Sequence, residues 1–76
     1  MPHVIIKLHS GKSETQKTRL AEEIAKALMT SLGYGEECVS VGVEDVALRD
    51  WVEKIYKPDI LDKPSTIYKK PGYNPV

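Results

Sequence analysis

Cysteine is almost absent from this sequence, because Cys38 is the only one among 76 residues. A single thiol cannot form a disulfide within the chain, and no cysteine–histidine cluster has the spacing of a zinc site. These absences favour a reducing compartment, so we expect a cytoplasmic protein without a metal ion. A chain this short buries only about 60% of the surface that its unfolded form exposes, so we expect a partner subunit to add stability.

An excess of either charge is also missing, since 11 lysine and arginine residues balance 11 aspartate and glutamate residues. Nucleic-acid-binding domains usually carry a strong basic excess, so neither DNA nor RNA is an expected partner. The apolar runs are a few residues long, far below the roughly 20 residues that cross a bilayer, and no basic-then-apolar leader begins the chain. We therefore expect one soluble domain, complete over residues 1–76, and no membrane partner.

The sequence does contain the pattern of a strand followed by a helix. Apolar residues alternate with other residues between Pro2 and Leu8, and β-branched side chains are frequent there, which predicts a strand. Ser13 and Gln16 have the spacing of a capping box, so a helix is expected to begin near Ser13 and to end at Gly33. An apolar residue recurs every four positions along this helix, at Leu20, Ile24, Leu28 and Leu32.

A second strand is expected where Val39, Val41 and Val43 alternate with less apolar residues. A helix between two strands returns the chain to the same end of the sheet, so the strands should be parallel and joined by a right-handed crossover. The fold class is therefore α/β (α+β), built on one βαβ unit. Two strands leave a face and both edges of the sheet uncovered, so we expect a second subunit to extend or cover the sheet.

The last third of the chain carries weaker signals. Trp51 lies in a segment that predicts a short helix over about residues 50–57, and a second helical piece is expected from Pro58 onward. The tail after these pieces is rich in turn residues, and its Tyr73 is interpreted as a packing residue.

Several of these features follow one another in a characteristic order: an initial Met1-Pro2, a strand, a Gly11-Lys12 turn, a helix start at Gln16-Lys17, a valine-rich second strand and an aromatic residue at Trp51. In this combination the sequence resembles the 4-oxalocrotonate tautomerase family. The longer carboxyl-terminal part, with "DWVEKIY" and "IYKKPGY", looks most like the dimeric bacterial branch of that family, which implies a homodimer.

The resemblance implies that Pro2 is a catalytic base once Met1 has been removed. A free α-amino group titrates near 7.7–8.0, and an apolar pocket beside a cation such as Lys12 would lower the pKa of this amine further. The implied reaction is the keto-enol tautomerisation of a small 2-oxo acid or its enol, without a cofactor. The amine belongs to the backbone of a strand, so its position is fixed by the sheet.

The resemblance also implies where substrate binds. Lys12 stands where the family usually has a first arginine, and it keeps the charge but loses the bidentate fork. Ser40 stands where the family has a second arginine, which favours a monocarboxylate with an apolar or aromatic body over a dicarboxylate. Trp51 matches the family's pocket aromatic, and Arg49 could replace the missing arginine from a neighbouring subunit.

Each of these residues also has a plainer interpretation. Lys12 could be a solvated turn residue, Trp51 a core residue and Arg49 a surface residue at a helix start. His3 and His9 are interpreted as strand-surface residues, since neither has a partner at metal-ligand spacing. A non-catalytic dimeric module that binds a small acid or a protein is the alternative function, and retention of Met1 would favour it.

Overall fold

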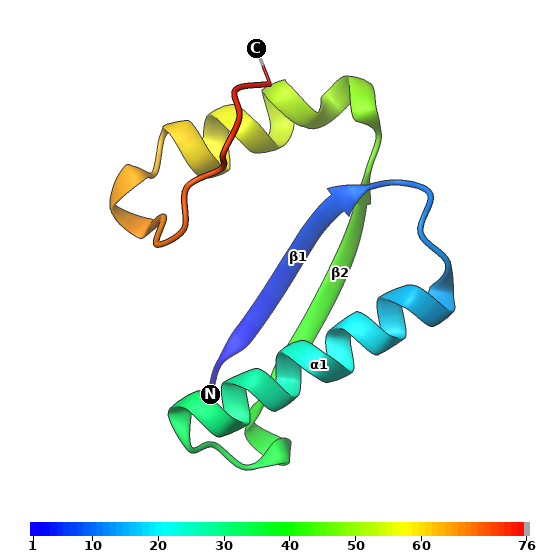
Figure 1. Ribbon diagram of the computed structural model, residues 1–76, viewed down its shortest axis with the longest axis vertical. Helices are drawn as coiled ribbons and strands as arrows, with labels where there is room; N and C mark the ends of the chain where they lie inside the picture. Colours follow the sequence, from blue (N-terminus) through cyan, green and yellow to red (C-terminus); the bar gives the residue numbers. More distant parts are fainter. Residues whose placement is uncertain (76) are drawn as a thin grey trace.

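The computed structural model describes residues 1–75 and contains the predicted βαβ unit. Strand β1 (His3–His9) is followed by helix α1 (Glu14–Leu32) and strand β2 (Ser40–Val46). The two strands pair in parallel, in register from His3 opposite Ser40 to His9 opposite Val46. Figure 1 shows α1 lying across one face of this two-stranded sheet, so the predicted topology is confirmed.

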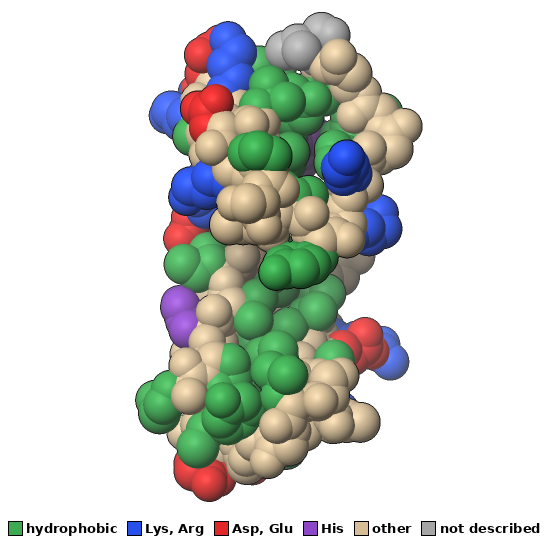
Figure 2. All heavy atoms as spheres, turned by 90° about the vertical axis from the view of Figure 1, so that its left-hand side faces the viewer, with side chains coloured by type: hydrophobic (Ala, Val, Ile, Leu, Met, Phe, Trp, Pro, Cys, Tyr) green, Lys and Arg blue, Asp and Glu red, His purple; other side chains and the backbone are tan. Residues whose placement is uncertain are grey.

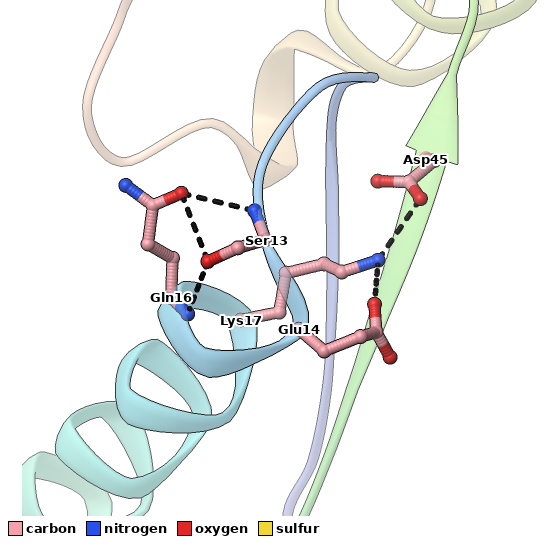
Figure 3. A network of polar contacts seen from close by, with 5 residues as sticks. All are labelled: Ser13, Glu14, Gln16, Lys17 and Asp45. Atoms are coloured by element: carbon pink, nitrogen blue, oxygen red, sulfur yellow. Dashed lines mark hydrogen bonds and ion pairs between the residues drawn. The ribbon is translucent and has the colours of Figure 1, made fainter.

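Helix α1 begins where the capping box predicted it. The Ser13 side chain accepts a hydrogen bond from the Gln16 backbone N–H at 3.1 Å, and the Gln16 side chain accepts one from the Ser13 N–H at 2.9 Å (Figure 3). Two backbone donors that the first turn leaves unsatisfied are thereby paired. The helix ends at Gly33, which has a φ of 77° and donates its N–H to the Met29 carbonyl at 2.9 Å.

Lys17 attaches the start of α1 to the end of β2. Its ammonium group lies 2.7 Å from Glu14 and 3.0 Å from Asp45, and its side chain is 18% exposed (Figure 3). The hydrogen bonds to Glu14 and Asp45 raise the pKa of Lys17. Helix and sheet are therefore joined by a charged contact at this end of the molecule as well as by apolar packing.

The alternation of side chains gives the sheet two different faces. Leu8 lines a cavity with Leu20 of α1, so the even-numbered residues of β1 face the helix. The odd-numbered residues face the other way, and Ile5 among them is 49% exposed. The carboxyl-terminal third covers only part of this second face, through contacts with Lys7 and His9.

The carboxyl-terminal third differs from the prediction of a helix that stops at Pro58. A short turn (Leu48–Asp50) leads into one wide, π-type helix, η3 (Val52–Leu61), with Pro58 inside it. Proline lacks the N–H that a helix needs, but the Asp62 N–H bonds the Lys57 carbonyl at 2.9 Å and so carries the turn past Pro58. The prediction of two separate helical pieces was therefore wrong.

Few side chains are deeply buried. Among residues 1–75 the buried hydrophobic ones are Ile55 and Tyr56, both in η3. Figure 2 shows hydrophobic side chains gathered on the lower half of one side of the molecule, over the start of β1 and the end of α1. Met1 and Ile5, at the start of the chain and in β1, and Leu32, at the end of α1, are exposed by 89%, 49% and 57%. No helix within residues 1–75 is both long and apolar enough to cross a membrane.

Candidate active site

Pro2 lies at the start of β1 and is half-buried. Its carbonyl oxygen accepts a hydrogen bond from the Ser40 backbone N–H at 3.2 Å, which extends the pairing of the two strands to the end of the chain. Met1, which precedes it, is 89% exposed. The sheet therefore fixes Pro2, whereas Met1 could be removed with little loss of packing.

Ser40 and His3 form a polar pair beside Pro2. The His3 Nδ1 atom lies 2.6 Å from the Ser40 Oγ atom, and both residues are exposed. They stand opposite each other in the parallel register, so their side chains project from the same face of the sheet. The sequence predicted His3 only as a strand-surface residue. The signal that could have revealed this contact is a polar residue at the first position of each of two parallel strands.

Lys12 and Trp51 line one cavity at the opposite end of the strands. This cavity has a volume of about 360 Å³ and is lined by Lys7, Leu8, His9, Lys12, Trp51 and Tyr73. The Trp51 and His9 rings meet edge to face, with their centroids 4.6 Å apart at an angle of 89°. The structure thus brings together the cation and the aromatic ring that sequence analysis assigned to substrate.

The two lysines that line this cavity differ in whether a carboxylate lies beside the ammonium group. The Lys7 ammonium group lies 2.6 Å from the Asp59 carboxylate of η3, and this hydrogen bond raises the pKa of Lys7. Lys12 is exposed and forms no ion pair with any residue in the described part of the chain. Lys12 is therefore the cation of this cavity that is available to an anionic ligand.

Of two further residues outside the strands, Tyr73 lines this cavity and Arg49 does not. Tyr73, which was interpreted as a packing residue in a turn-rich tail, is 64% exposed and lines the cavity. Arg49 lies in the turn over Leu48–Asp50, is exposed, and does not line it. Arg49 therefore adds no charge to the cavity within a single chain.

Pro2 and Lys12 lie at opposite ends of β1, as Figure 1 shows from the positions of the N-terminus and of the β1–α1 connection. A strand rises about 3.3 Å per residue, so the 7 residues of β1 separate the two groups by roughly 20 Å. The expectation that Lys12 lies beside the amine of Pro2 is therefore wrong for one chain. The extended strand between them is the physical reason.

No metal site accompanies these residues. Within residues 1–75, no group of three or more histidine, cysteine, aspartate or glutamate side chains is placed to hold an ion. The polar groups at the two ends of the sheet include two imidazoles, two hydroxyl groups and two ammonium groups. Such groups can transfer protons, donate hydrogen bonds and bind carboxylates.

Comparison with known proteins places this arrangement in a family. The sequence profile described as Tautomerase enzyme matches residues 2–54. A probable tautomerase from Xylella fastidiosa (strain 9a5c) is 42% identical over 73 residues, which cover 96% of this chain and 89% of that protein. Tautomerase PptA from Enterobacter sp. (strain 638) is 35% identical over 75 residues, which cover 97% of this chain and 99% of that protein.

Solved structures agree with the sequence comparisons. A 4-oxalocrotonate tautomerase isozyme from Methylibium petroleiphilum superimposes with a TM-score of 0.64 and 34% sequence identity, over 66% of this chain and 81% of that chain. Its similarity extends to the βαβ fold described above. The chain therefore belongs to the 4-oxalocrotonate tautomerase family and is a tautomerase, an isomerase.

Proposed function

We propose that this tautomerase interconverts the enol and keto forms of a small 2-oxo acid, with Pro2 as the general base and no cofactor. The observation that carries the proposal is the cavity in which Lys12 and Trp51 lie together. A cation suits the carboxylate of such a substrate, and an aromatic wall suits an apolar or aryl body. The fixed position of Pro2 at the start of β1 supplies the base.

The proposed reaction consists of two proton transfers. The secondary amine of Pro2 takes the proton from the enol hydroxyl group, and the oxygen keeps the electron pair of the broken O–H bond. This pair forms the carbonyl bond, and the π electrons of the C=C bond take the proton from the Pro2 ammonium group at carbon. An α-amino group titrates near 7.7–8.0, so it can accept and return a proton close to neutral pH.

The proposed active site needs two copies of the chain. One copy separates Pro2 from the cavity of Lys12 by the length of β1, which is roughly 20 Å and longer than a small 2-oxo acid. The exposed apolar side chains near the start of β1 offer a surface for the second copy. We propose a homodimer in which Pro2 of one subunit faces the Lys12 and Trp51 cavity of the other.

The proposed substrate is a monocarboxylate. Ser40 has a short neutral side chain that bonds His3, and Arg49 lies outside the cavity, so one carboxylate has a clear partner in Lys12. We expect the enol of an aryl 2-oxo acid such as phenylpyruvate to ketonise faster than a dicarboxylate such as 2-hydroxymuconate. The missing charged hydrogen bond corresponds to roughly 1.5–3 kcal/mol, or about ten- to a hundredfold in kcat/KM.

Measurement of kcat/KM for both substrates, on the protein lacking Met1, tests this choice. A clear preference for the dicarboxylate would contradict it and would direct attention to Arg49 as a second cation.

The compartment that we propose is the cytoplasm, because Cys38 is the only cysteine and is free.

A further inference from the structure

We propose that His3 is a catalytic residue of this enzyme and that its Nε2 atom donates a hydrogen bond to the substrate oxygen that changes charge during tautomerisation. This inference rests on the proposed function, because it assigns a second role at the site of Pro2. Ser40 has a positioning role in it, since Ser40 touches His3 and need not touch the substrate.

The geometry that carries the inference is the contact between these two residues. The His3 Nδ1 atom lies 2.6 Å from the Ser40 Oγ atom, a short hydrogen bond across the paired strands. The Ser40 backbone N–H also bonds the Pro2 carbonyl oxygen at 3.2 Å. Ser40 therefore holds the backbone of Pro2 and the ring of His3 at the same time, so the base and the imidazole keep a fixed relation to each other.

The direction of this hydrogen bond, which depends on the tautomer of His3, decides which ring nitrogen can donate, and in the proposed arrangement the serine hydroxyl group is the donor. When the serine hydroxyl group donates to Nδ1, a neutral imidazole carries its proton on Nε2. The Nε2–H group is then a donor on the side of the ring away from Ser40. His3 is exposed, so this edge is open to a ligand at the start of β1.

The chemistry needs such a donor. When the amine of Pro2 takes the proton from the enol hydroxyl group, negative charge develops on the oxygen until the carbonyl bond forms. A donor already aimed at that oxygen stabilises the transition state more than the ground state. The donor only shares its proton, so the two proton transfers through Pro2 remain balanced as written above.

The rest of this sheet face offers no equivalent group near Pro2. The next pair of residues on the same face is Ile5 opposite Gly42, which carry no polar side chain. The following pair begins with Lys7, whose ammonium group is bonded to Asp59. His3 and Ser40 are therefore the polar side chains that this face presents at its Pro2 end.

Steady-state kinetics of the dimer with the enol of phenylpyruvate test the assignment. We expect His3→Ala to lower kcat by about 10²-fold with little change in KM, because the lost bond forms in the transition state. His3→Gln, whose amide can donate at a similar reach, should recover part of this loss. If His3→Ala does not fold, His3→Asn carries the same expectation, since its shorter amide can bond Ser40 but reaches less far than Nε2.

The ¹⁵N chemical shifts of the imidazole report the tautomer of His3, and a purely structural role of His3 would not require one particular tautomer. We expect the Nε2–H tautomer in the wild-type protein and a mixture of tautomers in Ser40→Ala, together with a smaller fall in kcat. A wild-type ring protonated on Nδ1 would overturn the proposal, as would a His3→Ala variant that changes KM alone.

Failure of this inference can be told from failure of the proposed function. If Pro2→Ala lowers activity strongly while His3→Ala keeps the wild-type kcat, His3 has no catalytic role and the tautomerase mechanism stands. If the wild-type protein without Met1 shows no tautomerisation, both proposals are wrong.

Discussion

The residues that we propose for the active site lie in two groups, one for substrate binding and one for proton transfer. Lys12 and Trp51 line the cavity at one end of the strands, whereas Pro2 lies at the other end beside His3 and Ser40. Lys12 has no ion-pair partner within residues 1–75, so its charge is available to a ligand. A substitution at Lys12 should therefore act chiefly on substrate binding.

We expect Lys12→Ala to lower kcat/KM for an aryl 2-oxo enol by about ten- to a hundredfold, chiefly through KM, because a charged hydrogen bond is worth roughly 1.5–3 kcal/mol. Lys12→Arg should retain the activity, since a guanidinium group binds a carboxylate with two parallel hydrogen bonds. Lys26→Ala, at an exposed position of α1, is the matched control. Equal kinetics for Lys12→Ala and Lys26→Ala would remove Lys12 from the site.

At the residue scale, the sequence predicted candidate residues, but it did not predict how far apart Pro2 and Lys12 lie in one chain. Lys12 and Trp51 could be paired in advance through the family resemblance, and they do share a cavity. The contact between His3 and Ser40 was not predicted, because it depends on the register of the two strands as well as on the polar residue at the start of each. A shift of one residue would have turned the two side chains to opposite faces.

Local signals at its ends fix helix α1, whereas helix η3 depends on tertiary packing. Helix α1 has a complete capping box at its start and a left-handed glycine at its end, and both can be predicted from the sequence. Helix η3 has no side-chain cap and contains Pro58, so the local rules favoured a break there. Its burial of Ile55 and Tyr56 shows that tertiary packing overrides the local signal.

Loss of the cap should weaken α1 measurably. We expect Ser13→Ala to lower the free energy of unfolding by about 1 kcal/mol, because the Gln16 N–H loses its acceptor. Denaturant unfolding at fixed protein concentration measures the change. Ser31→Ala, in the last turn of the same helix, is the control and should be neutral or slightly stabilising. An unchanged free energy in Ser13→Ala would show that the cap contributes nothing.

The attachment of η3 to the sheet should weaken as the pH becomes alkaline. Hydrogen bonding to Asp59 raises the pKa of Lys7 in the folded protein above its usual value of 10.5. The stabilising contribution is therefore complete below pH 10.5 and is lost as the pH rises through the higher folded value. We expect the free energy of unfolding to fall over this range more steeply in the wild type than in Lys7→Gln.

Lys17 titrates in the same direction, so both proteins will lose some stability at high pH. The difference between the two curves isolates the contribution of Lys7. Parallel curves for the wild type and Lys7→Gln above pH 10.5 would show that the bond to Asp59 does not stabilise the folded chain.

The molecule as a whole buries few side chains. Its two strands leave one face partly bare, and some of its exposed apolar side chains gather over the start of β1 and the end of α1 (Figure 2). The fold could be predicted as a βαβ unit, because each element has its own periodicity and end signals. The completed site could not, because Pro2 and Lys12, which would act together, lie at opposite ends of β1 in one chain.

We expect light scattering at micromolar concentration to report about twice the chain mass of 8.5 kDa. A dimer would let the start of β1 in one copy approach the cavity of Lys12 and Trp51 in the other. A stable monomer that is fully active would contradict the shared site, and a mass near six chains would replace the dimer by a hexamer.

The central claim, that the amine of Pro2 is the base, is tested most directly by intact-mass analysis and activity measured on the same samples. Chains lacking Met1 should be active, and a fraction that keeps Met1 should lose about 10²–10⁴-fold in kcat/KM, because an amide nitrogen is not basic near neutral pH. Pro2→Ala, which keeps a less constrained amine, should retain reduced activity. Full activity in a preparation that keeps Met1 on every chain would contradict the mechanism.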